Sequence, residues 1–257
     1  MAERSGQMWM ATLAWRGTAY AGWQIQPNAP TIQGALEAAV AAMCGLDGAI
    51  PVSATGRTDA GVHAKMQIIG FRLPVERTPH QVVSGINHHT ASDISCLQAQ
   101  MMPDDFSPRR WARGKLYRYR ILNRKPRCPF RAEFVWHMRT ALDVQAMSLA
   151  IPTLVGQHDF SSFRAAGCSA NTTVRTIQAA RCRRSEDDEL ILEFEGHGFL
   201  RHQVRIMAGT LVDIGLGRRS ASEMEDILAA QDRAAAGQTA PAQGLTLVSV
   251  QMGDGPG

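Results

Sequence analysis

The stretch ATGRTDAGVHA, residues 54–64, has neither a helical nor a strand period, although segments typical of both flank it. It brings Arg57, Asp59 and His63 within seven positions, together with two glycines. Such a segment is either a surface turn at Asp59-Ala60-Gly61 with Arg57 in solvent, or a loop that carries chemistry. It is not a phosphate-binding P-loop, because no Gly-Lys-Ser/Thr sequence follows the glycines.

Outward from this loop, the first part of the chain alternates strands and helices. Before the loop, residues 8–15 are rich in strand formers, and residues 31–44 repeat apolar side chains at helical spacing behind a threonine that can cap a helix. After the loop, we expect strands at residues 66–73 and 94–101 and a short helix at 79–87. This order predicts an α+β unit.

The second part of the chain repeats a similar order of elements. In residues 116–122 apolar side chains alternate with arginines, which predicts a strand with one apolar and one basic face. The other expected elements are helices at 143–154, 199–216 and 220–230 and strands at 174–183, 190–195 and 245–250. We therefore predict an α+β fold of two related halves, residues 1–105 and 106–257, whose mixed or antiparallel sheets join into a platform.

Composition excludes several classes of protein. The 257 residues are 45% hydrophobic, enough for a substantial core, and contain no run of roughly 18 to 20 apolar residues. The N-terminal segment lacks the apolar stretch of a secretory signal, so we expect a cytoplasmic protein. The five cysteines include no C-x-x-C spacing, which disfavours a disulfide scaffold, a zinc ribbon or thioredoxin chemistry.

Positive charge is concentrated in residues 101–140. The whole chain carries a net charge of +4, yet this segment alone holds eleven cationic and three acidic side chains, a local net charge of +8. Most of the cations are arginines, whose planar fork suits phosphate contacts and base stacking. The segment is therefore either a surface for an extended anionic partner such as nucleic acid, or a solvated arginine face.

Six sequence motifs of this chain resemble those of a known protein family. Residues 57–64, RTDAGVHA, resemble the R-T-D-x-G-V-H catalytic loop of the TruA family of tRNA pseudouridine synthases, whose aspartate is essential. The other segments are YAGWQ at 20–24 (Y-x-G-W-Q), KLYRY at 115–119 (K/R-x-Y-x-Y), HDFSSFR at 158–164 (D-F-x-S-F-R), FLRHQVR at 199–205 (F-x-x-H-x-V-R) and GLTL at 244–247 (G-L-x-L). The resemblance extends from about residue 8 to residue 250 and implies the pseudouridine synthase fold, with two ferredoxin-like or RRM-like halves.

Two departures from the family lie outside the loop. Where the family has Y-D-G, this chain has Trp15-Arg16-Gly17, and where the family often has F-H-A-R, this chain has Phe106-Ser107-Pro108-Arg109. Arg16 replaces an acidic residue and Ser107 replaces a histidine. We expect these changes to affect contacts with RNA and the range of substrates.

The resemblance implies an isomerase that converts uridine to pseudouridine at positions 38, 39 and 40 of the tRNA anticodon arm. The N1–C1′ bond breaks, the base rotates, and C5 forms the new bond, without metal, nucleotide or other cofactor. The target nucleotide must first be flipped out of its stack, at a cost of a few kcal/mol. The resemblance also implies a homodimer, and the lack of a long apolar run argues against a membrane partner. A catalytically silent tRNA-binding or RNA-folding module is the alternative, although the aspartate is present.

By the resemblance, Asp59 is the catalytic carboxylate, either as a nucleophile or as the base that removes a sugar proton. An ionised carboxylate in a water-poor pocket needs a cation close by, and the resemblance makes Arg205 that partner. From local pattern alone, Arg205 is equally a surface residue of the helix expected at 199–216.

The remaining candidate residues contact substrate, and each has an alternative role. Tyr117 is expected to act in catalysis by stacking on the flipped uracil and assisting the loss of the C5 proton, or to be a core strand residue, the role that we expect for Tyr119. Arg57 displaces the base or contacts a phosphate, and Leu245 packs on the base or in the core. Further substrate-binding candidates are His63, Arg109, Lys115 and His202. No cysteine or carboxylate spacing completes a metal site with the histidines.

Overall fold

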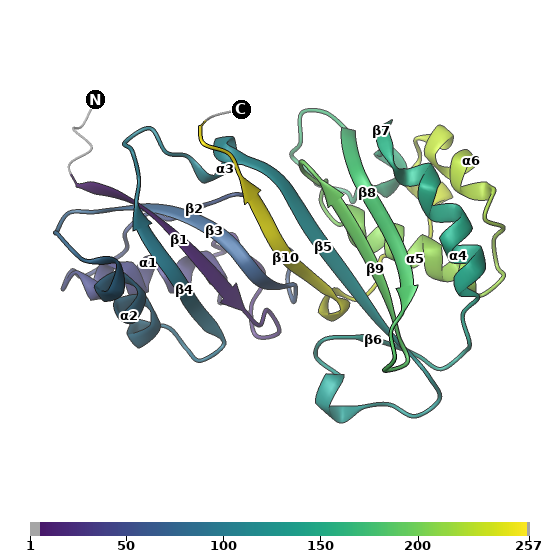
Figure 1. The fold of residues 1–257 in the computed structure, drawn as a ribbon, viewed down its shortest axis with the longest axis horizontal. Helices are drawn as coiled ribbons and strands as arrows, with labels where there is room; N and C mark the ends of the chain where they lie inside the picture. The colour runs from purple at the N-terminus through teal and green to yellow at the C-terminus, as the bar shows by residue number, and fades with distance from the viewer. Residues whose placement is uncertain (1–5, 256–257) are drawn as a thin grey trace. The chain divides into compact units, whose positions relative to one another are not determined.

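The computed structural model describes residues 6–255, which form two compact units. Unit 1 contains the chain up to Arg113 together with the segment from Leu247 on, and unit 2 is Gly114–Thr246. The division differs from the expected one after residue 105, because the helix that follows residue 107 packs on strands of unit 1. The last strand also returns to unit 1, beside its central strand β3. Figure 1 shows the course of the chain.

Unit 1 is a sheet with the strand order β4-β1-β3-β10. Strand β1 is antiparallel to both β3 and β4, and the short β2 pairs with β3. Helices α1 and α2 pack on each other, and α2 packs on β4. The elements are β1 (Gln7–Trp15), α1 (Ile32–Met43), β2 (Ser53–Ala54), β3 (His63–Leu73), α2 (Pro79–His89), β4 (Ile94–Met101), α3 (Pro108–Trp111) and β10 (Leu245–Met252).

The helices of unit 1 begin where their capping residues predict. The Thr31 side chain accepts a hydrogen bond from Gly34 N, and the buried face of α1 carries the apolar side chains that repeat at helical spacing. Thr78 and Gln81 form a reciprocal capping box at the start of α2. Strand β3 begins at His63, three residues earlier than expected, so the strand starts within the motif of residues 57–64.

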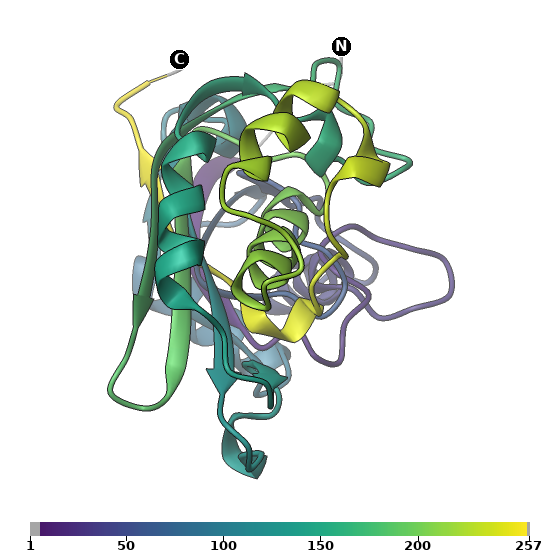
Figure 2. The ribbon, with the colours of Figure 1, turned by 90° about the vertical axis from the view of Figure 1, so that its right-hand side faces the viewer.

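Unit 2 is a mixed sheet with the order β5-β9-β8-β7, covered by helices. Successive strands are antiparallel, whereas β6 pairs with β5 in parallel. Figures 1 and 2 show α4, α5 and α6 gathered on one face of this sheet. The main elements are β5 (Ala112–Asn123), β6 (Trp136–Met138), α4 (Val144–Ala150), β7 (Gly156–Asp159), β8 (Val174–Arg184), β9 (Glu189–Gly196), α5 (Gln203–Gly215) and α6 (Glu223–Ala230). Short 3-10 turns are η1 (Pro129–Arg131), η2 (Ile151–Leu154), η3 (Ser161–Phe163), η4 (Arg233–Ala235) and η5 (Ala242–Gly244).

The α+β class is confirmed, and two expected helices are shorter than predicted. The helix expected at 199–216 begins at Gln203, because His202 has a left-handed backbone with φ of 60°. The helix expected at 143–154 becomes 3-10 after Ala150, since Pro152 cannot donate an α-helical hydrogen bond. Among residues 6–255, no helix is long and apolar enough to span a bilayer.

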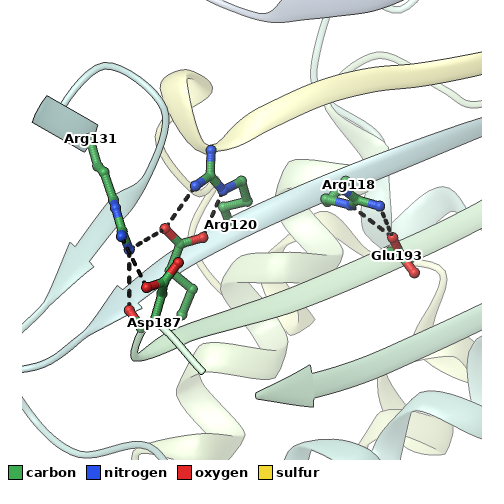
Figure 3. A network of polar contacts seen from close by, with 6 residues as sticks. Arg118, Arg120, Arg131, Asp187 and Glu193 are labelled. Atoms are coloured by element: carbon green, nitrogen blue, oxygen red, sulfur yellow. Dashed lines mark hydrogen bonds and ion pairs between the residues drawn. The ribbon is translucent and has the colours of Figure 1, made fainter. Parts of the chain in front are cut away.

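Strand β5 has the two faces that its alternating sequence predicts. Tyr117, Tyr119 and Ile121 are buried, while Arg118 and Arg120 point to the opposite face. The basic face is neutralised by neighbouring residues. Arg118 lies 2.7 Å from Glu193 on β9, and Arg120 lies 2.7 Å from Glu189 at the start of β9 (Figure 3).

The structure therefore corrects the expectation from the charge of residues 101–140. Four of the nine arginines in that segment form ion pairs with acidic side chains of residues 187–193, which lie outside it in sequence. These four are Arg118, Arg120, Arg124 and Arg131. The net charge of +8 counts only residues 101–140. Because acidic side chains from outside this segment pair with four of its arginines, the folded surface offers fewer unpaired cations to an anionic partner than that charge suggests.

Tyr119 links the sheet of unit 2 to the segment that follows α6. Its side chain is fully buried, and its hydroxyl donates a hydrogen bond of 2.7 Å to the Pro241 carbonyl. Burial raises the pKa of this hydroxyl far above its usual value, so the group stays a neutral donor. A Cβ on Gly244 would lie 2.6 Å from the Tyr119 ring, so only glycine fits there.

We expect Tyr119→Phe to lower the free energy of unfolding by about 1 kcal/mol, because the Pro241 carbonyl loses its donor while ring packing remains. Gly244→Ala should cost more, because its methyl group collides with the ring. Urea denaturation followed by fluorescence measures both changes. Equal stability of Tyr119→Phe and the native protein would show that this hydrogen bond contributes nothing.

Candidate active site

The RTDAGVHA segment forms a tight turn between β2 and β3. Val62 N donates a hydrogen bond of 3.1 Å to the Asp59 carbonyl, which closes a turn around Ala60 and Gly61. Gly61 has a φ of +77° at the third position, as a type II turn requires. Asp59 is half-buried at the first corner, and Arg57 is exposed. A turn and a chemical loop are therefore compatible descriptions of this segment.

The segment at residues 15–24 holds this loop through hydrogen bonds to its backbone. Trp23 N donates to the Thr58 carbonyl at 3.0 Å, and Gly61 N donates to the Tyr20 carbonyl at 3.2 Å. The Trp15 indole N–H donates to the Val62 carbonyl at 3.1 Å. These contacts fix the backbone on both sides of Asp59. Trp23 itself is buried, and its ring lies 5.8 Å from that of Trp15.

Glycine at position 22 permits this close approach. Gly22 has a φ of +95°, and a Cβ there would lie 2.7 Å from the Thr58 oxygen and 3.0 Å from Ala60 N. A Cβ on Gly17 would likewise collide with the Val62 carbonyl. Both positions thus need a residue without a side chain if the two segments are to touch.

Two further side chains anchor the segment at residues 15–24. The Tyr20 hydroxyl donates a hydrogen bond of 2.7 Å to Asp93, and burial together with that bond raises the pKa of Tyr20 to about 12. Arg16 N donates to the Asp93 carbonyl at 2.9 Å. His63 is only 2% exposed, and its Nδ1 accepts a hydrogen bond of 3.0 Å from Gly17 N. His63 therefore supports the loop from inside the protein.

In unit 2, Tyr117 lies on β5 with a side chain that is 9% exposed. Its ring meets Phe199 edge to face, with centroids 5.2 Å apart and an interplanar angle of 83°. Such a contact fixes the orientation of the Tyr117 ring. Tyr119, two residues on, is the core residue that the alternation predicts.

The turn that begins α5 positions Arg205. His202 adopts the left-handed backbone, and Leu200 N donates to the Gln203 side chain at 2.8 Å. Arg205 then lies in the first turn of α5 and is half-buried. Its Nε donates to the Ala240 carbonyl at 2.8 Å, and Ala240 N donates back to the Arg205 carbonyl at 3.1 Å. The arginine is thus held in place rather than being a mobile surface side chain.

The other candidates differ in exposure. Leu245 is 4% exposed at the start of β10, and Lys115 and His202 are half-buried. Arg109 is exposed on α3. Within residues 6–255, no three His, Cys, Asp or Glu side chains come together as metal ligands would.

The D-F-x-S-F-R motif has a structural role. Asp159 accepts hydrogen bonds from Ser161 N at 2.8 Å and from the Ser161 hydroxyl at 2.7 Å, and the hydroxyl contact lowers the pKa of Asp159. Phe160 and Phe163 are fully buried. The motif therefore shapes a turn against the core of unit 2.

Sequence reasoning did not assign the supporting residues Tyr20 and Gly22. Their signal is present in the YAGWQ motif, one of the six that carry the resemblance. The glycine of this motif permits a close backbone approach, but only the fold identifies the RTDAGVHA loop as its partner.

A family model described as tRNA pseudouridine synthase matches residues 11–109 and 150–251. The chain belongs to the tRNA pseudouridine synthase family. Among similar proteins, tRNA pseudouridine synthase A of Myxococcus xanthus is 45% identical over 245 residues, which cover 95% of this chain and 92% of that protein. The protein of the same name from Halalkalibacterium halodurans is 46% identical over 238 residues, covering 91% of this chain and 88% of that protein. Membership in this family implies the pseudouridine synthase fold.

We expect Gly22→Ala to destabilise the protein by about 1–3 kcal/mol and to slow pseudouridine formation on the order of 10²-fold, because the added methyl group displaces the loop that carries Asp59. Gly45→Ala is the matched control, since Gly45 also has a positive φ, of +70°, but a Cβ there would have no atom within 4 Å. Denaturant unfolding and a tRNA modification assay measure both variants. Equal effects of the two substitutions would mean that backbone strain, and not collision with the loop, decides the outcome.

Proposed function

We propose that this protein isomerises uridine to pseudouridine in tRNA, at positions 38, 39 and 40 of the anticodon arm. The observation that carries the proposal is the RTDAGVHA loop in a chain of the tRNA pseudouridine synthase family, with its aspartate present at Asp59. The hydrogen bonds that hold the loop backbone support it, because a reacting carboxylate must be kept in place.

In the proposed reaction, the N1–C1′ bond of the target uridine breaks and C5 of the rotated base forms the new bond to C1′. Asp59 acts either as the nucleophile or as the base that removes a sugar proton. Arg205 is the proposed cation that keeps the carboxylate ionised when tRNA excludes water. Support for this role comes from the family motif and from the hydrogen bond that holds Arg205 Nε.

The remaining roles concern the flipped nucleotide. Tyr117 is proposed to stack on the uracil, and its contact with Phe199 supports this because a fixed ring loses little entropy on binding. Arg57 is proposed to help displace the base or to contact a phosphate, and its exposure is compatible with both. Leu245, His202, Lys115 and Arg109 are proposed to line the path of the RNA. We also propose a cytoplasmic location, which a tRNA substrate supports.

Release of tritium from tRNA that carries [5-³H]uridine tests the proposal, because forming the C5 bond must expel that hydrogen. We expect release by the native protein and a loss on the order of 10³-fold or more in Asp59→Asn, which keeps the side-chain shape but removes the charge. Asp47→Asn, at an exposed carboxylate of the same unit, is the matched control and should release tritium at the native rate.

Binding of tRNA by both proteins without release from either one would contradict the proposal. It would instead indicate an RNA-binding module with an inactive loop. Retained binding by Asp59→Asn, measured by filter retention, shows that the loss of activity is chemical.

We also propose that the protein acts as a homodimer, as the resemblance to its family implies. Light scattering at micromolar concentration should give a mass near twice the 28.0 kDa of the chain. A mass of one chain under these conditions would exclude the dimer.

A further inference from the structure

The loop between β5 and β6, residues 124–135, carries an unusually exposed aromatic side chain. Phe130 is 95% exposed, whereas the other exposed large hydrophobic side chains in the described structure range from 38% to 73%. Figures 1 and 2 both show this loop extending from unit 2 beyond β6, with a short turn of helix near its end. The Phe130 ring is therefore open to contact by a partner over almost its whole surface.

The 3-10 turn η1 within this loop is fastened to the turn between β8 and β9. Arg131 forms ion pairs with Asp187 at 3.3 Å and with Glu189 at 3.1 Å, and its guanidinium also donates to the Asp187 carbonyl at 3.2 Å (Figure 3). The hydrogen bond to Asp187 raises the pKa of Arg131. Arg124 lies 3.8 Å from Asp188 and donates to the Pro126 carbonyl. The loop is therefore a defined structure that presents Phe130.

These ion pairs also decide which charges the loop presents outward. The acidic side chains of residues 187–189 face Arg124 and Arg131, so their charges are balanced within the protein. Lys125 and Arg127 are exposed, and neither forms an ion pair in the part of the chain that the structure describes. Pro126 and Pro129 restrict the backbone around them. The loop thus carries an almost fully exposed aromatic ring and, earlier in its sequence, two exposed cations.

We propose that this loop binds an unpaired nucleotide of the tRNA, with the base stacked on Phe130 and the adjacent phosphates on Lys125 and Arg127. Aromatic rings beside cations are how proteins bind single-stranded nucleic acid without strict sequence readout. The inference rests on the proposed function, which makes tRNA the substrate.

The nucleotide at Phe130 differs from the one that reacts. Tyr117 lies six residues before Asn123 at the end of β5, a distance of about 20 Å along an extended strand. The loop begins only after Asn123. Phe130 and Tyr117 therefore contact nucleotides several positions apart, and the loop helps to hold the tRNA while the reaction takes place elsewhere.

Substitution of Phe130 tests this inference in the full-length protein. We expect Phe130→Ala to raise the Kd for unmodified transcribed tRNA by about 5- to 150-fold, the range that removal of one base–aromatic stack predicts. The rate of tritium release at saturating tRNA should stay at the native value, and Phe130→Trp should keep native affinity. Leu149→Ala, at another exposed apolar side chain of unit 2, is the matched control and should bind as the native protein does.

The salt dependence of tRNA binding tests the role of Lys125 and Arg127. Lys125→Gln with Arg127→Gln should reduce the slope of log Kd against log salt concentration by about 0.7 for each phosphate that the side chains no longer neutralise. An unchanged slope would overturn the phosphate contacts.

The outcomes separate this inference from the proposed function. If the native protein binds and modifies tRNA while Phe130→Ala has the same Kd as Leu149→Ala, the stacking role alone is overturned. If light scattering shows that Phe130→Ala dissociates an oligomer, the loop serves a second copy of the chain instead, which also overturns it. A native protein that neither binds nor modifies tRNA overturns both proposals.

Discussion

Backbone hydrogen bonds between two loops of unit 1 fix the position of Asp59. Trp23 N and the Tyr20 carbonyl pair with the backbone of the turn, on either side of the aspartate. Hydrogen bonds of this kind need the two backbones to approach closely, which Gly17 and Gly22 make possible because they have no side chain. The chemistry proposed for Asp59 thus depends on backbone contacts in which almost no side chain of the RTDAGVHA loop takes part.

Some arginines of this chain form ion pairs within the protein, and others remain available to a partner. Arg118 and Arg120 form ion pairs across the open face of the unit 2 sheet, and Arg131 fastens a loop to the neighbouring turn. Such partly exposed pairs contribute little stability individually, but together they hold one geometry. The cations that remain for an RNA partner are fewer and more localised than the charge of the sequence indicates, with Lys125 and Arg127 as the examples in unit 2.

In each unit, an irregular piece of backbone positions a proposed site residue. In unit 1 it is the turn closed at Val62, and in unit 2 it is the left-handed His202, which begins α5 so that Arg205 falls in its first turn. Non-glycine residues in this conformation cost free energy and persist where the surrounding structure requires them. Both irregular segments lie within the motifs that the family shares.

The sequence by itself determined the α+β class, the capped helix behind Thr31 and the two-faced strand at Tyr117, because capping and side-chain periodicity are local properties. The prediction that Asp59 is the catalytic residue also comes from the sequence, through the eight-residue motif of residues 57–64. Only the tertiary structure decided that β10 returns to unit 1 and that Glu189 neutralises Arg120, since these contacts join residues far apart in the chain. Local pattern carries no information about such partners, and the fold alone brings them together.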